Sequence, residues 1–199
     1  MKLLIVYGSP KKEGICHSFL NAALDTAKSA GAEAVVLKLS QEKIDQCKMC
    51  GEGWGSCRSE HKCQYGDKDS FNALQEKFNE ADAFVFISPV YWGDMSEAFK
   101  NFFDKLRRCQ ATKRWNEDEN IKSFFTDKPS IIVASAGGSG NGILSALTQI
   151  ERAIVHMGGD NMPKEQKGIF DYIGVNRWNK EYKLEALKAA ITAMLKGPK

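Results

Sequence analysis

The chain lacks any hydrophobic run long enough to cross a membrane, since no apolar stretch approaches the ~20 residues that a transmembrane helix needs. It also lacks an excess of one charge, because the formal net charge is only +3 and the two signs are well mixed. So small a charge gives no reason to expect nucleic acid or a membrane surface as a partner. Internal repeats, a Gly-x-Gly-x-x-Gly loop and a Walker loop are also missing, which removes the common dinucleotide and nucleotide motifs.

The composition is that of a single globular domain covering residues 1–199. Hydrophobic residues make up 43% and charged residues 27% of the chain, and its length allows a substantial core. The six cysteines occur without an export signal, because the apolar start LLIVY is too short for one. We therefore expect a cytoplasmic protein with mostly reduced thiols, in which a tight cysteine cluster indicates metal binding or redox use.

Strand-like and helix-like segments alternate along the chain. Short, nearly continuous apolar runs predict five strands, at 3–7, 34–39, 81–88, 130–135 and within 168–175. Apolar residues three or four apart predict the intervening helices, over about 19–27, 69–81, 95–106, 143–157 and 180–196. This alternation predicts a doubly wound α/β fold, a five-stranded parallel sheet of order 2-1-3-4-5.

Local signals refine this prediction. Gly31 is placed to end the first helix, and Asp94 and Glu97 have the spacing of a capping box at the start of the third. Residues 40–68 show no periodicity and predict an excursion after the second strand, with a Cys-rich loop at 45–66. The polar residues 109–128 predict a solvated connection or lid.

The first strand ends in a turn that suits an anion. Gly8 and Ser9 begin the turn, and Cys16, His17 and Ser18 open the following helix, whose N-terminus offers backbone N–H groups and a positive dipole. The Ser9 and Ser18 hydroxyls and the Lys11 ammonium can add donors. An ordinary strand-to-helix turn would have the same composition.

Two further strand ends have ligand-type loops. The third strand runs into Pro89, Val90, Tyr91, Trp92 and Gly93, which present flat apolar surface and backbone N–H groups suited to a planar, amide-rich ring. The fourth strand ends at Ser135 and continues through Gly137, Gly138 and Ser139, where backbone can approach a ligand closely. As alternatives to a ligand site, the aromatic residues after the third strand could cap the core, and the glycines after the fourth strand could form an ordinary tight loop. The coincidence of three such loops on adjacent strands favours a ligand site.

The cysteine segment is CKMCGEGWGSCRSEHKC, in which Cys47, Cys50, Cys57 and Cys63 have the spacing C-x2-C-x6-C-x5-C. Four thiolates in one loop can ligate a [4Fe–4S] cluster or a tetrahedral zinc ion, with His61 able to replace one thiolate on zinc. Free or redox-active thiols are the third alternative. Cys109 stands apart, with a structural role. Arg107, Arg108, Lys113 and Arg114 form either a solvated helix end or a contact for nicotinamide phosphates.

The segments GSPKK, ADAFVFISPVYWG and SEAFKNFFDKL resemble the flavodoxin-like NADPH-dependent FMN reductases, and within them the iron–sulfur flavoproteins. The resemblance is strongest over residues 1–108. It implies that the first loop holds the FMN phosphate, PVYWG the isoalloxazine ring, and residues 137–139 its far edge. The implied cofactor-binding residues are Ser9, Lys11, Cys16, His17, Ser18, Phe19, Pro89, Val90, Tyr91, Trp92, Gly93, Ser135, Gly137, Gly138 and Ser139.

The chain departs from the family in three places. Lys11 stands where the family usually has Arg, Cys16 replaces a hydroxyl residue, and the second cysteine gap is longer. The resemblance implies FMN-dependent reduction of a quinone, a free flavin or another small acceptor by NAD(P)H. The alternatives are an electron carrier between redox proteins, of flavodoxin or iron–sulfur flavoprotein type, and a zinc-stapled interaction module. A homodimer or dimer of dimers is also implied.

Overall fold

A computed structural model describes residues 1–160 and 167–197. Within these residues a six-stranded sheet has the order β2-β1-β3-β5-β6, and the short β4 pairs with β3 outside this path. The parallel strands are β1 (Lys2–Tyr7), β2 (Glu33–Lys38), β3 (Ala83–Tyr91), β5 (Ser130–Ser135) and β6 (Ile169–Val175). Because β5 and β6 are the fourth and fifth strands predicted above, the predicted order is confirmed.

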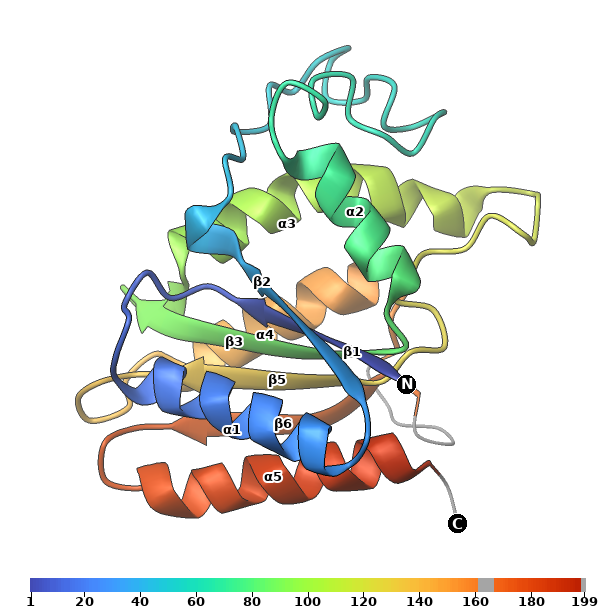
Figure 1. Ribbon diagram of the computed structural model, residues 1–199. Coiled ribbons are helices and arrows are strands. Elements are labelled where there is room, and N and C mark those ends of the chain that lie inside the picture. Colours follow the sequence, from blue (N-terminus) through green and yellow to red (C-terminus); the bar gives the residue numbers. More distant parts are fainter. Residues whose placement is uncertain (161–166, 198–199) are drawn as a thin grey trace.

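Helices cover both faces of the sheet (Figure 1). On one face lie α1 (Ile15–Ser29) and α5 (Lys180–Lys196), and on the other lie α2 (Phe71–Glu80), α3 (Glu97–Gln110) and α4 (Ile143–His156). Gly31, at φ 72, follows the end of α1 as predicted. Among the helices that the structure describes, none combines the length and the apolar character needed to cross a membrane.

The central strand β3 is buried along most of its length. Its residues Ala83 to Pro89 are all buried, with Phe84 and Phe86 in the apolar cluster under α2–α4 and Val85 and Ile87 in the cluster under α1 and α5. Burying each large apolar side chain contributes about 1.5–3 kcal/mol. Strand β3 therefore carries its carboxyl end, and the loop beyond it, on a well-packed platform.

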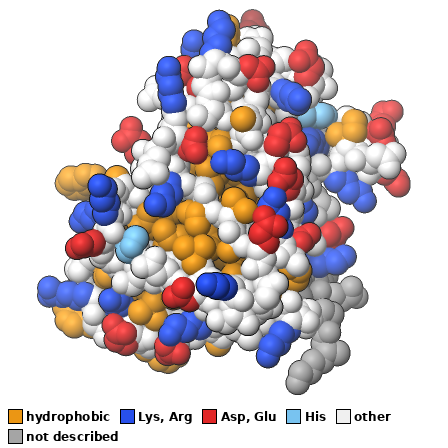
Figure 2. Space-filling view, in the orientation of Figure 1, with side chains coloured by type: hydrophobic (Ala, Val, Ile, Leu, Met, Phe, Trp, Pro, Cys, Tyr) orange, Lys and Arg blue, Asp and Glu red, His pale blue; other side chains and the backbone are white. Residues whose placement is uncertain are grey.

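Strand β2 is the edge of the sheet next to β1. Its Ala34, Val35 and Val36 are only half-buried, and Figure 2 shows apolar surface over this strand, surrounded by charged side chains. Beyond β2 the chain forms the short 3-10 helix η1 (Leu39–Gln41) and then the predicted excursion, which Figure 1 shows above α2 and α3. The cysteine segment is thus a separate lobe on one side of the sheet.

The predicted capping box before α3 is wrong. Asp94 and Met95 form β4, which turns back on Val90 and Tyr91, and the Asp94 carboxylate accepts the Met95 N–H at 2.6 Å. The helix begins later, at Glu97, after an N-cap Ser96 whose side chain makes no capping bond. A two-residue strand is too short to leave a periodic signal, so the pattern assigned these residues to the helix.

The predicted solvated connection at 109–128 is only partly correct. Helix α3 extends to Gln110 and continues as the 3-10 helix η2 (Ala111–Trp115), while Cys109 is fully buried. Further on, Phe124 and Phe125 are buried and pack against Phe78, with ring centroids 4.9 and 6.0 Å away. Two adjacent aromatic residues thus anchor the end of this polar segment to the core, while residues 116–120 are exposed as predicted.

Candidate functional site

The loops after β1, β3 and β5 meet at one edge of the sheet, at the left of Figure 1. Tyr7 is in register with Ile87, and Pro89 with Ser135, so the three strands end together. Cys16 joins the loops, because its thiol lies close enough to Ser135 and to Tyr91 for the Ser135 side chain to lower its pKa and for the thiol to raise the pKa of the Tyr91 phenol. The structure therefore brings together the predicted phosphate-side and ring-side residues.

The α1 N-terminus lacks a side-chain cap. Its N-cap is Gly14, at φ 109, and the N–H groups of the first turn, at residues 15–17, have no partner within a helix. Lys11, just before the helix, is exposed, and His17 in the first turn is half-buried. This end of α1 keeps its positive dipole and backbone donors available for an anion.

Three other residues predicted to bind the cofactor stabilise the loop after β1 and the start of α1. Ser9 is 4% exposed; its hydroxyl accepts the Lys11 N–H at 3.3 Å and its carbonyl accepts the Ser40 hydroxyl at 3.2 Å. The Ser18 hydroxyl donates to the Gly14 carbonyl at 3.3 Å, and the Phe19 side chain is fully buried in the core. Ser9 and Ser18 thus hold the turn, and Phe19 anchors α1.

Burial raises the pKa of the Cys16 thiol to about 11, although the hydrogen bond with Ser135 and the charge of Lys11 oppose this change. The thiol is therefore protonated at neutral pH. Cys16 stands at this position as a small, uncharged group and not as a nucleophile.

The turn between β3 and β4 projects an aromatic pair. Trp92, at φ 51, and Gly93, at φ 81, form the turn; Trp92 is 105% exposed and Tyr91 41% exposed. The φ values of both residues are positive, as in the two-residue hairpins that join antiparallel strands. The hairpin leaves the apolar indole ring fully exposed to water. Such exposed apolar surface indicates a binding site, where another group would cover the ring.

The exit of β5 lies against this turn. A Cβ atom added to Gly142 would lie 2.5 Å from the Gly93 Cα, so the two loops touch through backbone. Gly137 and Gly138, by contrast, are exposed, and a Cβ atom on either would meet nothing within 4 Å. The loop after β5 thus contacts the β3–β4 hairpin at Gly142 and leaves its backbone accessible at Gly137 and Gly138.

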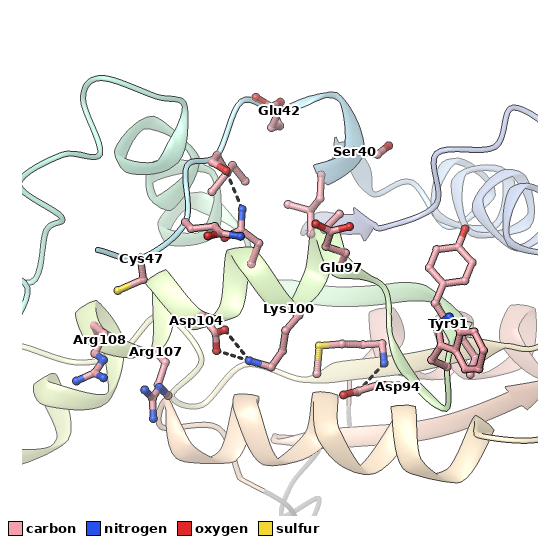
Figure 3. Close-up of a pocket in the computed structure, with 18 of the residues that line it drawn as sticks. Ser40, Glu42, Cys47, Tyr91, Asp94, Glu97, Lys100, Asp104, Arg107 and Arg108 are labelled. Carbon is pink, nitrogen blue, oxygen red and sulfur yellow. Dashed lines mark hydrogen bonds and ion pairs between the residues drawn. The ribbon is translucent and has the colours of Figure 1, made fainter. Parts of the chain in front are cut away.

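A groove of about 1340 Å³ extends from this hairpin along α3. Tyr91 and Trp92 line one end, Arg107 and Arg108 the other, and Figure 3 shows the Lys100–Asp104 ion pair between them. The ten residues from Ala98 to Arg107 span about 14 Å along the helix. The sequence did not reveal this groove, because its walls come from α3, the hairpin and the start of the cysteine lobe.

The cysteine lobe encloses a second, small cavity. Cys47, Cys50, Cys57 and Cys63 all line it, together with Cys109 of α3. Burial raises the pKa of the Cys57 thiol, and the neighbouring Cys50, Cys47 and Cys63 add to this effect. The four cysteines that the sequence singled out therefore face one cavity.

Among the described residues, these thiols are not arranged as the ligand set of a single metal ion. The described residues contain no group of three or more His, Cys, Asp or Glu side chains arranged to hold an ion. A zinc ion held at ~2.3 Å from each sulfur would require a tighter set. His61 does not line the cavity, because its Nδ1 lies 3.1 Å from the Thr112 hydroxyl on η2.

Buried charges that the sequence analysis missed fasten this lobe. Asp69 accepts hydrogen bonds from Lys105 Nζ at 2.6 Å, from the Asp45 N–H at 2.8 Å and from the Phe71 N–H at 2.8 Å. The Asp69 side chain is 0% exposed and that of Lys105 is 2% exposed. One carboxylate thus ties the beginning of the lobe to α2 and α3.

Comparison with known proteins gives the family. The family model for NADPH-dependent FMN reductase matches residues 1–169. An iron–sulfur flavoprotein of Methanosarcina thermophila is 32% identical over 145 residues, 71% of this chain and 66% of that protein. An FMN-dependent NADH:quinone oxidoreductase of Bacillus licheniformis is 27% identical over 151 residues, 69% of this chain and 70% of that protein.

The chain spans 66%, 46% and 51% of the length of three iron–sulfur flavoproteins that it matches. Among solved structures, NAD(P)H:quinone oxidoreductase from Methanothermobacter marburgensis superposes with a TM-score of 0.62 at 17% identity, covering 96% of this chain and 94% of that one. This likeness shows a shared flavodoxin-like fold. The chain therefore belongs to the NADPH-dependent FMN reductase family, a family of oxidoreductases.

Proposed function

We propose that this protein binds FMN at the carboxyl edge of its sheet and uses NAD(P)H to reduce a quinone, a free flavin or another small acceptor. The observation that carries the proposal is the meeting of three loops, in which Cys16 contacts Ser135 and neighbours Tyr91. The uncapped α1 N-terminus and Lys11 would hold the phosphate. The β3–β4 hairpin and the open backbone at Gly137 and Gly138 would hold the ring.

The residues present fit such a group. Gly14, at φ 109, leaves room above the helix N-terminus, since a Cβ atom there would meet nothing within 4 Å. The exposed Tyr91 and Trp92 rings supply the stacking surface that a flavin needs, each worth about 1 kcal/mol beyond the area it buries. When bound, FMN supplies hydride and electron transfer, and the protein supplies placement and electrostatics.

The groove along α3 would receive the nicotinamide cofactor or the acceptor. It begins at Tyr91 and Trp92, so a molecule in it would reach the proposed ring position. Arg107 and Arg108 make the far end positive, where they would meet the phosphates of a nicotinamide cofactor. Glu42, Asp94 and Glu97 line the rest of the groove, and Asp104 is paired with Lys100 at 2.6 Å.

We further propose that Cys47, Cys50, Cys57 and Cys63 ligate a [4Fe–4S] cluster, which would supply one-electron transfer. Two observations support the fit: all four line one cavity, and the buried Nε of Arg108, which also lines it, has no hydrogen-bond partner among the described residues. Four cysteine thiolates are the ligand set that such a cluster would need. The iron–sulfur flavoprotein relatives favour the same centre.

An anaerobic single-turnover experiment tests the enzymatic proposal. Bound flavin should bleach on mixing with NADPH or NADH, and should reoxidise on adding a quinone or free FMN. A flavin that neither nicotinamide reduces, but that reduced ferredoxin does, would assign the protein instead to electron transfer between proteins.

Single Cys→Ser variants test the proposed cluster. Each of Cys47→Ser, Cys50→Ser, Cys57→Ser and Cys63→Ser should abolish bound iron and sulfide in anaerobically purified protein. Cys16→Ser, which lies in α1, is the matched control and should keep both. Wild-type protein that holds FMN but neither iron nor sulfide would end the cluster proposal, and zinc in their place would revive the alternative centre.

A further inference from the structure

Arg108 stands in the wall between the groove and the cysteine cavity. Its side chain lines both, as do Gln46 and Cys47, and Figure 3 shows Arg108 and Cys47 at the same end of the groove. A group at this place touches whatever occupies the cysteine cavity and also faces the route by which electrons would enter from the groove.

The cysteine lobe holds the guanidinium in a fixed position. Nη1 donates to the Gly53 carbonyl, Nη2 donates to the Met49 sulfur at 3.3 Å, and the group lies 4.7 Å from the centre of the Trp54 ring. These contacts constrain its two terminal nitrogens and one flat face. The arrangement is more specific than the solvated helix end that the sequence suggested.

The third guanidinium nitrogen, Nε, lacks a hydrogen-bond partner among the described residues. Nε is buried, and no described residue accepts its N–H. A buried N–H of a charged group that lacks an acceptor destabilises a protein by more than an ordinary hydrogen bond stabilises it. The buried Nε–H therefore indicates an acceptor that the polypeptide does not supply. Arg108 and the four cysteines line the same cavity, so a group held there by the cysteines would lie on the side where this acceptor is missing.

The charge of Arg108 is also unmatched. Among the cations that line the cysteine cavity, Lys105 is paired with Asp69 at 2.6 Å and Lys48 is exposed. Arg108 forms no ion pair with any carboxylate of the described residues. A partly buried, uncompensated positive charge therefore stands beside four cysteines.

We propose that Arg108 is a positioning residue for the four-cysteine centre, donating its Nε–H to a sulfur there and stabilising the reduced form by its charge. This inference rests on the cluster proposed above. Each one-electron reduction adds one negative charge to the centre, which a fixed neighbouring cation favours. Hydrogen bonds to the sulfurs and local charge are two of the factors that set the potentials of such clusters.

Redox titration followed by EPR tests this role in the full, anaerobically prepared protein. Arg108→Leu should lower the midpoint potential, changing the ratio of reduced to oxidised centre about tenfold at fixed potential, or about 59 mV for one electron. Arg108→Lys should fall between wild type and Arg108→Leu, because it keeps the charge but loses the Nε–H. Arg114→Leu removes the same charge from an exposed position of η2 that lines neither the groove nor the cysteine cavity, and it should leave the potential unchanged.

Two results would overturn the proposal. One is an unchanged potential in an Arg108→Leu protein that retains full iron and sulfide. The other is complete loss of iron in both Arg108→Leu and Arg108→Lys, which would give Arg108 only the role of fastening the lobe. Wild-type iron and sulfide content is measured first, so that absence of the cluster itself is distinguished from failure of the Arg108 role.

Discussion

The Asp69→Asn substitution tests whether a buried ion pair fastens the cysteine lobe to the flavodoxin-like domain. Asparagine keeps the shape of the side chain but removes its charge. The new amide N–H₂ group would also face at least one of the three groups that now donate hydrogen bonds to Asp69. These donors are the Asp45 N–H, the Phe71 N–H and Lys105 Nζ. Lys105, only 2% exposed, would then be a buried cation without a counter-ion.

The expected loss is large because both partners are buried. Removing one partner of a buried ion pair typically costs about 3–5 kcal/mol, against a total stability of about 5–15 kcal/mol for a domain. The exposed pair Lys100–Asp104 has the same 2.6 Å separation and provides a matched control. Asp104→Asn should cost less than about 1 kcal/mol, because solvent screens that pair.

Urea unfolding of the flavin-free protein, followed by tryptophan fluorescence, measures both changes. Adding Lys105→Met to Asp69→Asn should recover part of the loss, because it removes the stranded charge and leaves an apolar chain beside Phe71, whose ring centre lies 4.8 Å from Lys105 Nζ. A loss in Asp69→Asn no greater than that in Asp104→Asn would refute the reasoning.

The pair also sets a pH dependence. Burial alone would raise the pKa of Asp69, but the hydrogen bonds from Lys105 and from the Phe71 and Asp45 N–H groups outweigh it and hold the pKa below its ordinary value. The stabilisation is therefore present above the ordinary carboxyl pKa and is lost as the pH falls through the lower folded-state value. Wild type and Asp69→Asn should converge in stability toward acid.

Three further predictions concern the FMN site. Tyr91→Ala and Trp92→Ala should each weaken FMN binding about fivefold in a fluorescence titration, and unchanged affinity in both would contradict the proposed stacking. Gly142→Ala should lower both stability and FMN affinity, since its Cβ would lie 2.5 Å from Gly93 Cα at φ +82, whereas Gly137→Ala should lower only FMN affinity; equal stability losses would refute this distinction. Cys16, with its pKa raised to about 11, should react with iodoacetamide in flavin-free protein roughly a hundredfold more slowly at about pH 8 than a free thiol, and rapid labelling would show it to be exposed.

The sheet and its ligand-type loops were predictable because their signals are local. A buried parallel strand such as 83–89 is a continuous apolar run, and a loop that must approach a ligand closely is rich in glycine. The order of strands followed from alternation with helices and from the rules of the doubly wound fold. The sequence thus located the three loops and the four cysteines.

What the sequence did not reveal depends on contacts between distant segments. Asp69 and Lys105 are 36 residues apart and look like ordinary surface charges until the lobe folds over α3. Arg108 is half-buried only because residues 49–54 close on it. Phe124 and Phe125 are buried in the core, but they lie in a segment that is polar on average, so its composition did not predict their burial.

The FMN content of purified protein tests the central claim most directly. Protein prepared without added flavin should be yellow, and denaturation should release FMN in an amount stoichiometric with the chain, identified by chromatography and fluorescence. Flavin-free protein should rebind added FMN, and Trp92→Ala should rebind it more weakly. Colourless protein that neither contains nor binds FMN would contradict the assignment of the three strand-end loops as a flavin site.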